Sequence, residues 1–132
     1  MSGTFAIVNP PELGAPRGFA HGLIAPSSGR LLFVAGQTPQ NREAPTGFAQ
    51  QFDDALARVL TVVRAAGGRP EQIARMTVYV TDMDAYRESR PALRDLWRRH
   101  MGSHYPAMAL VAVTALVDEQ AMVEIEATAV LS

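Results

Sequence analysis

The amino-acid sequence predicts an α+β domain in which a mixed sheet of about six strands carries two helices on one of its faces. Two observations support this fold class. Two long segments repeat apolar residues at helical spacing, whereas shorter apolar segments alternate as strands do. Along the chain the segments follow the order strand, hairpin, helix, strand, helix and a final pair of strands. The chain has 132 residues, enough for one core but not two, so residues 1–132 are expected to form a single domain.

The N-terminal segments predict a short strand followed by a hairpin. Phe5–Val8 is a short apolar run, and Asn9–Pro16 is a loop because its Pro-Pro pair prevents regular strand pairing. Phe19–Ala25 and Leu31–Ala35 are apolar runs on either side of Ser27–Arg30, whose Ser and Gly residues are typical of a turn. These two runs are therefore expected to pair with each other.

The most regular segment predicts a long first helix. Thr46 can cap its N-terminus, and Gly67 and Gly68 end it. Eight apolar residues recur along it at helical spacing: Phe48, Phe52, Ala55, Leu56, Val59, Val62, Val63 and Ala66. One apolar face of this helix should pack on the sheet.

A strand and a second helix follow the first helix. Pro70–Ile73 predicts one helical turn, and Met76–Val80 predicts a strand. Asp82 or Asp84 can cap the second helix, and Gly102 ends it. The apolar face of this helix consists of Tyr86, Leu93, Leu96 and Trp97.

The C-terminal segment, His104–Leu131, predicts two strands around a short turn. In the second strand Glu124 and Glu126 alternate with apolar residues, so both acids lie on the face opposite to Val123 and Ile125. The face with the acids should border a cleft, a subunit contact or water. Since both helices cover one side of the sheet, the other side is bare, and a soluble chain would cover such an apolar surface by self-association. We therefore expect a homo-oligomer.

Composition excludes several classes of function. The net charge of −1 and the pI near 6.3 give no general attraction to nucleic acid or to an anionic membrane. There is no Cys, and all 12 basic residues are Arg, which excludes thiol nucleophiles and a lysine Schiff base. The three histidines, His21, His100 and His104, lack metal-ligand spacing, so no metal site is expected. The N-terminus lacks the features of a signal peptide, and we expect a cytoplasmic protein.

Three runs together resemble a known family. They are Leu31–Pro39 with its G-Q-x-P ending, Arg75–Asp82, and Tyr105–Ala107 followed by Val123–Ala127. Their order and spacing resemble the Rid (RidA/YjgF, reactive intermediate deaminase) family over nearly the whole chain. The resemblance implies a chorismate-mutase-like subunit and a homotrimer with inward-facing sheets and three ligand clefts at subunit boundaries. It also implies hydrolysis of enamines and imines, typically 2-iminoacids, to 2-oxoacids and ammonia, without a metal or organic cofactor.

The sequence departs from the family pattern at the residue that anchors the substrate. RidA-like deaminases hold the substrate carboxylate with an Arg after the Pro-Ala pair, and Met108 stands there in this chain. Losing that charged hydrogen bonding removes about 1.5–3 kcal/mol of binding. Ala35 replaces a frequent Ser, and Phe19 replaces the cleft Tyr, so the expected cleft is more apolar than usual. Standard 2-iminoacid deamination is therefore doubtful.

Other positions match the family or offer a substitute. Gly36 can present its backbone N–H to an oxygen of the ligand, and Glu124 is the candidate catalytic acid that orients or activates water. Arg90 occupies the position of a cleft Asn and is a hypothetical replacement for the lost cation. Together with Phe19, Ala35 and Met108, these residues are the predicted ligand-binding set.

Structural interpretations stay open beside these functional ones. Glu124 can instead be a solvated or interface carboxylate, Glu126 can pair with an Arg at a subunit contact, and Met108 can simply fill the core. The strip of Arg87, Arg90, Arg94 and Arg98 could face RNA, but interleaved acids favour a solvated surface: Asp84, Glu88 and Asp95.

The sequence thus predicts a small-molecule-binding protein and, on one interpretation, an enamine or imine hydrolase with an atypical substrate. A non-catalytic ligand-binding or chaperone-like protein is the alternative, and an RNA-acting protein is a more distant one.

Overall fold

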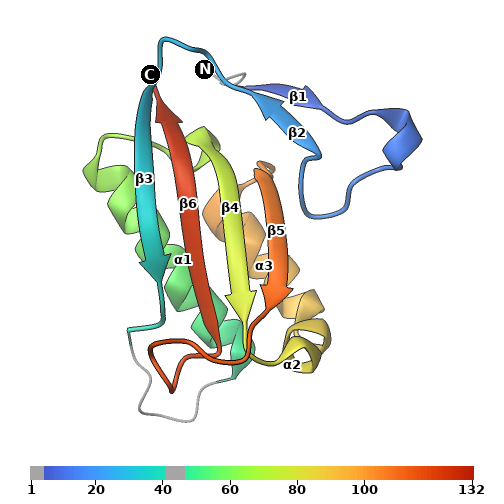
Figure 1. Cartoon of the computed structure of the whole chain (residues 1–132), viewed down its shortest axis with the longest axis vertical. Helices are drawn as coiled ribbons and strands as arrows, with labels where there is room; N and C mark the ends of the chain where they lie inside the picture. Colours follow the sequence, from blue (N-terminus) through green and yellow to red (C-terminus); the bar gives the residue numbers. More distant parts are fainter. Residues whose placement is uncertain (1–4, 41–46) are drawn as a thin grey trace.

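A four-stranded mixed sheet forms the centre of the fold in the computed structural model, which describes residues 5–40 and 47–132 (Figure 1). The strands of this sheet are β3 (Arg30–Gln37), β6 (Val123–Leu131), β4 (Ile73–Val80) and β5 (Ala107–Ala112), in that spatial order. β6 is antiparallel to both of its neighbours, and β5 is parallel to β4. The α+β class and the mixed character of the sheet are therefore confirmed.

The predicted set of about six strands is present but is divided between two sheets. β1 (Ala6–Val8) and β2 (Gly22–Ile24) pair with each other as a separate antiparallel ribbon, drawn in blue beside the main sheet in Figure 1. The prediction that Phe19–Ala25 forms a hairpin with Leu31–Ala35 is wrong, because β3 pairs with β6 instead. The long buried strand β6 has partners on both sides, and β3 pairs with it from Arg30 to Val34 and again at Gln37.

The predicted C-terminal strand pair is also wrong in its pairing. β5 and β6 both form, but β4 lies between them, and residues 113–122 connect them in place of a short turn. A parallel neighbour cannot be reached through a tight turn, so β5 enters the sheet beside β4 after the helical crossover.

Two long helices cover one face of the main sheet, as predicted. α1 (Phe48–Ala65) and α3 (Arg90–Met101) lie behind the sheet in Figure 1, and the short α2 (Met83–Glu88) precedes α3. The N-cap of α1 is Gly47, while the predicted cap, Thr46, lies outside the described residues. The side chain of Asp82 caps α2 by accepting a hydrogen bond of 3.0 Å from the backbone N–H of Ala85, as predicted.

The second predicted helix is interrupted rather than continuous. α2 ends at Glu88 and α3 begins at Arg90. Pro91 stands at the start of α3, and a proline has no N–H with which to continue the ladder of the preceding turn. The single turn predicted near Pro70 is confirmed as a 3-10 helix, η2 (Pro70–Gln72), and a second, η1 (Pro11–Leu13), lies within the N-terminal loop.

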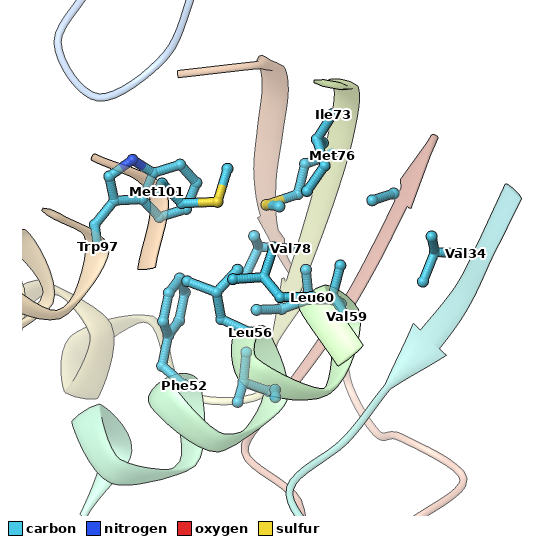
Figure 2. Packing of buried hydrophobic residues seen from close by; sticks show 14 of the residues in the cluster. Val34, Phe52, Leu56, Val59, Leu60, Ile73, Met76, Val78, Trp97 and Met101 are labelled. Carbon is cyan, nitrogen blue, oxygen red and sulfur yellow. The ribbon is translucent and has the colours of Figure 1, made fainter. Parts of the chain in front are cut away.

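The core lies between the helices and the sheet. Figure 2 shows Phe52, Leu56, Val59 and Leu60 of α1 packed against Val78 and neighbouring residues of the strands. Alternate residues of β6 are buried from Val123 to Ala129, while Glu124, Glu126 and Thr128 between them are half-buried on the other face. The predicted alternation of β6 is therefore confirmed.

The face of the sheet opposite the helices is open in the described part of the chain. Leu31 and Phe33 of β3 are 61% and 73% exposed there. The predicted bare face thus exists and carries large apolar side chains. In the described residues, no helix combines the length and apolar character needed to cross a membrane.

Candidate functional site

Gly36 and Glu124 meet on the open face of the sheet. The register between β3 and β6 shifts between Val34 and Gln37, so Ala35 and Gly36 lie in an irregular, exposed stretch of β3. A β-carbon built on Gly36 would lie 2.8 Å from the carboxyl carbon of Glu124. A β-carbon here would require the carboxylate of Glu124 to move, so the irregularity holds a backbone segment next to the predicted catalytic acid.

Glu126 has a different partner on the same face. The hydroxyl of Tyr79 donates a hydrogen bond of 2.7 Å to Oε2 of Glu126. This bond, the partial loss of hydration and the negative charges of Glu126 and Glu124 raise the pKa of the Tyr79 phenol above its usual value. Glu126 also borders a hollow of about 340 Å³ together with Arg75 and Phe33. A neutral phenol therefore holds Glu126 in place.

A larger pocket of about 520 Å³ lies on the helix side of the sheet. Met108 and Leu110 of β5 stand opposite the core residues Met76 and Val78 of β4, so they share the face that the helices cover. Both line this pocket. Its other apolar walls come from Phe52, Leu93 and Trp97. Met108 therefore borders a cavity on one side and packs against the core cluster on the other.

Arg90 lies at the same pocket as Met108. Its guanidinium carbon is 5.5 Å from the centre of the Tyr86 ring, a cation–π arrangement that fixes the side chain near the pocket. Arg90 could therefore supply a positive charge beside the position from which the family Arg is missing. Three further arginines line the pocket, and they are Arg17, Arg94 and Arg98.

Phe19 lies next to this pocket without lining it. The backbone N–H of Ala20 donates to the carbonyl oxygen of Pro106 at 3.0 Å, which holds the N-terminal loop against the start of β5. Arg17 and Gly18 of this loop line the pocket, whereas the ring of Phe19 packs edge-on against His21 with centroids 5.1 Å apart. The predicted ligand-binding residue Phe19 therefore does not line the cavity, whereas Arg17 and Gly18 of the same loop do.

The predicted site residues fall into two groups on opposite faces of the sheet. Ala35, Gly36 and Glu124 lie together at the open face, and Arg90 and Met108 lie together at the helix face. Glu124 pairs in register with Tyr79, whose neighbour Val78 points to the other side with Leu110. One chain alone therefore does not place the candidate acid beside the candidate anion site.

Sequence reasoning missed part of the helix-side pocket. Trp97 and Tyr105 stack with ring centroids 5.7 Å apart and planes 4° from parallel, and both line the cavity. Tyr105 is part of a run that matched the family pattern, and Trp97 was assigned to the apolar face of the second helix, but stacking between a helix and a loop leaves no periodic signal. Arg17 could not be placed either, because it lies on a loop with no regular spacing.

The interleaved acids only partly neutralise the arginine strip. Arg87 pairs with Asp84 at 3.6 Å, in agreement with the prediction. Within residues 5–40 and 47–132, Arg94 and Arg98 form no ion pair with Glu88 or Asp95. In the same residues, no group of three His, Asp or Glu side chains is arranged to hold a metal ion.

Comparisons with known proteins agree with the fold and the order of the motifs. The model of the family described as Endoribonuclease L-PSP matches residues 12–131. The 2-iminobutanoate/2-iminopropanoate deaminase of Escherichia coli is 30% identical over 133 residues, covering 98% of each chain. A Rid-family protein, YyfB from Yersinia pestis, has a solved structure that matches with a TM-score of 0.82 and 30% identity, covering 97% of this chain and 99% of that one.

A ligand-bound structure is also similar. The crystal structure of Escherichia coli TdcF with bound serine matches with a TM-score of 0.68 and 30% identity, over 90% of this chain and 92% of that one. Since the family model covers almost the entire sequence and full-length relatives share its fold, this chain belongs to the Rid (RidA/YjgF) family.

Proposed function

We propose that this protein is a homotrimer that binds a small molecule in clefts between its subunits and hydrolyses an enamine or imine there. The observation that carries the proposal is the contact between Gly36 and Glu124 on the open face. It puts a carboxylate beside a backbone segment whose N–H group can meet an oxygen or nitrogen of a ligand. Such a pair can position both a water molecule and the group that it attacks.

Glu124 is proposed to orient the attacking water and to accept its proton. Its carboxylate accepts a proton from the water as the water oxygen bonds to the carbon of the protonated imine (C=NH2+), which gives a neutral carbinolamine. The same proton then passes to the amino nitrogen and the C–N bond breaks. Ammonia leaves, Glu124 takes the remaining hydroxyl proton as the carbonyl forms, and this proton leaves with ammonia as ammonium. The reaction consumes one water per imine and needs no oxidant or reductant.

The open face supports assembly of identical chains. Exposed Leu31 and Phe33 would be covered by a neighbouring sheet, and the two groups of site residues could then meet across a subunit boundary. In this arrangement Glu124 of one subunit would approach the pocket at Met108 of another. We also propose that the protein acts in the cytoplasm.

The substrate is proposed to differ from a simple 2-iminoacid. A relative at 30% identity is named for deamination of 2-iminobutanoate and 2-iminopropanoate. In this chain Met108 stands where RidA-like members place the carboxylate anchor, and it lies in a cavity with several apolar walls. A molecule with a larger apolar portion suits such a cavity better than a three- or four-carbon iminoacid.

The test is release of ammonia from imines made in place by an amino-acid oxidase. The wild-type protein should accelerate ammonia formation over the blank for at least one amino acid with an apolar side chain. Glu124→Gln should reduce the added rate by about 10²-fold or more. Glu119→Gln, which changes an exposed acid in the loop before β6, is the matched control and should keep the rate.

A non-catalytic ligand-binding role is the second candidate, and the substitution at Met108 favours it. A rate equal to the blank for every imine, with no change in Met108→Arg, would argue for binding alone. An RNA-acting role, which the name of the family model suggests, would be supported by salt-sensitive RNA binding that weakens when Arg94 and Arg98 are replaced.

A further inference from the structure

The helix-side pocket concentrates positive charge around an apolar cavity. Four of its lining residues are arginines: Arg17, Arg90, Arg94 and Arg98. Among the described residues that line the pocket, none is Asp or Glu. The whole chain has a net charge of −1, so this local excess does not reflect a generally basic protein. The field in the pocket therefore favours an anion.

The charge of these arginines is available to a ligand. Arg90, Arg94 and Arg98 follow one another at intervals of four residues, so they share one side of α3. In the described ranges, none of the three forms an ion pair, although Glu88 and Asp95 are close in sequence. All three side chains are exposed. A strip of like charges without acidic partners is mutually repulsive and would be stabilised by a bound anion.

The walls of the pocket are apolar and fixed. The indole N–H of Trp97 donates to the carbonyl oxygen of His104 at 3.1 Å, so the ring is held in place and its polar group is already satisfied. Its face stacks on Tyr105. With Phe52 and Leu93 nearby, the cavity offers mostly apolar contacts behind its charged rim. Its volume of about 520 Å³ is that of a site for a small organic molecule.

We propose that this pocket binds an organic anion with an apolar or aromatic body. Arg94 and Arg98 hold the anionic group together with Arg90, and the body lies against Trp97 and Met108. An inorganic anion would leave the apolar walls in water, and a neutral apolar molecule would leave the guanidinium groups unused. This inference rests on the proposed function, because it names the substrate class of that cleft: an imine or enamine of a bulky apolar acid.

The binding test uses ligands that cannot be hydrolysed. Trp97 is the only tryptophan of the chain, so its fluorescence reports on the pocket directly. The ligands are 3-phenylpropanoate, its neutral analogue 3-phenylpropanamide and the short anion propanoate. 3-Phenylpropanoate should change the fluorescence with saturation and bind about tenfold more tightly than either of the others. Calorimetry should give the same order, and added salt should weaken the binding of the anion.

Variants separate this site from general surface charge. Arg94→Ala combined with Arg98→Ala should weaken binding of 3-phenylpropanoate by about tenfold or more. Arg64→Ala, at an exposed position of α1 outside the pocket, should leave it unchanged. Equal binding of the anion and the amide, or wild-type binding by the double variant, would overturn the proposal.

Failure of this inference and failure of the proposed hydrolysis give different results. Binding of 3-phenylpropanoate without ammonia release from any imine would support the anion pocket and contradict catalysis. Ammonia release from small imines without binding of 3-phenylpropanoate would overturn the anion pocket and leave catalysis standing.

Discussion

Gly36 lies so close to Glu124 that a β-carbon at position 36 would be 2.8 Å from the carboxyl carbon and 3.0 Å from Cγ. Atoms at such distances must move apart. We therefore expect Gly36→Ala to push the carboxylate of Glu124 out of its position and to lower imine hydrolysis about as much as Glu124→Gln does, by about 10²-fold. Ammonia release measures the effect, and far-ultraviolet circular dichroism checks that the fold is kept.

A matched substitution tests whether the contact matters rather than the glycine itself. A β-carbon on Gly47 would meet nothing within 4 Å, and its φ of −68° suits any residue. Gly47→Ala should keep the hydrolysis rate. Full activity in Gly36→Ala would show that Glu124 does not need its present position and would remove it from the proposed mechanism.

The sequence predicted the elements better than their pairing. The repeated apolar spacing from Phe48 to Val63 identifies α1 because a helix face is a local property. Which strand pairs with β3 is not local: the turn at Ser27–Arg30 has the composition of a hairpin, yet β3 pairs with β6, about a hundred residues away. Which strands pair depends on where each whole strand buries its apolar side. The residues adjacent in the sequence carry no signal of this choice.

The same limit applies to the candidate site. That Glu124 and Val123 point to opposite faces follows from strand alternation and was predictable. That Met108 points away from the face of Glu124 depends on the register between β4 and β5, which the sequence does not display. The four pocket arginines come from a loop and from α3, and only those on the helix could be grouped from their spacing.

The hydrogen bond from Tyr79 to Glu126 predicts that the stability of the folded protein falls at high pH. The bond raises the pKa of the folded phenol above its unfolded value of about 10. Its contribution to stability is thus fully present below pH 10 and is lost as the pH rises through the raised pKa. Glu126→Gln should move the ionisation of Tyr79 back toward lower pH. Absorbance of tyrosinate measures this shift, with Tyr79→Phe identifying which of the three tyrosines titrates.

The exposed ring of Phe33 predicts how the assembly can be broken. Phe33 is 73% exposed on the open face, in the edge strand β3, and a charge there would be buried in a sheet-to-sheet contact that covers this strand. Phe33→Glu should convert the expected trimer into monomers, as measured by sedimentation equilibrium. Val117→Glu, at a fully exposed loop position, should leave the assembly intact. A monomeric wild-type protein would contradict the shared cleft.

The packing of α1 on the sheet predicts a large loss of stability when a buried side chain of this helix is shortened. Leu56 is fully buried among the core residues (Figure 2), so Leu56→Ala should lower the free energy of unfolding by about 3 kcal/mol. Leu13→Ala removes the same atoms from a side chain that is 63% exposed and should cost much less. Denaturant unfolding at one fixed protein concentration measures both, because oligomer stability depends on concentration.

Met108→Arg should give the protein activity on small 2-iminoacids. A guanidinium at this position can hold the substrate carboxylate with two hydrogen bonds, worth about 1.5–3 kcal/mol or about ten- to a hundredfold in affinity. The new positive charge would lie in the pocket that Arg90 also lines. Repulsion between the two guanidinium groups should limit the gain in affinity to about tenfold. Met108→Leu keeps the apolar volume and should give no gain.

The same substitution should have the opposite effect on bulky ligands. An arginine side chain at position 108 would extend into the cavity beside Trp97 and occupy volume that the body of 3-phenylpropanoate needs. Binding of 3-phenylpropanoate should therefore weaken in Met108→Arg while turnover of small iminoacids rises. If both ligand classes gained together, size would not decide which molecules enter, and charge alone would set the specificity of the pocket.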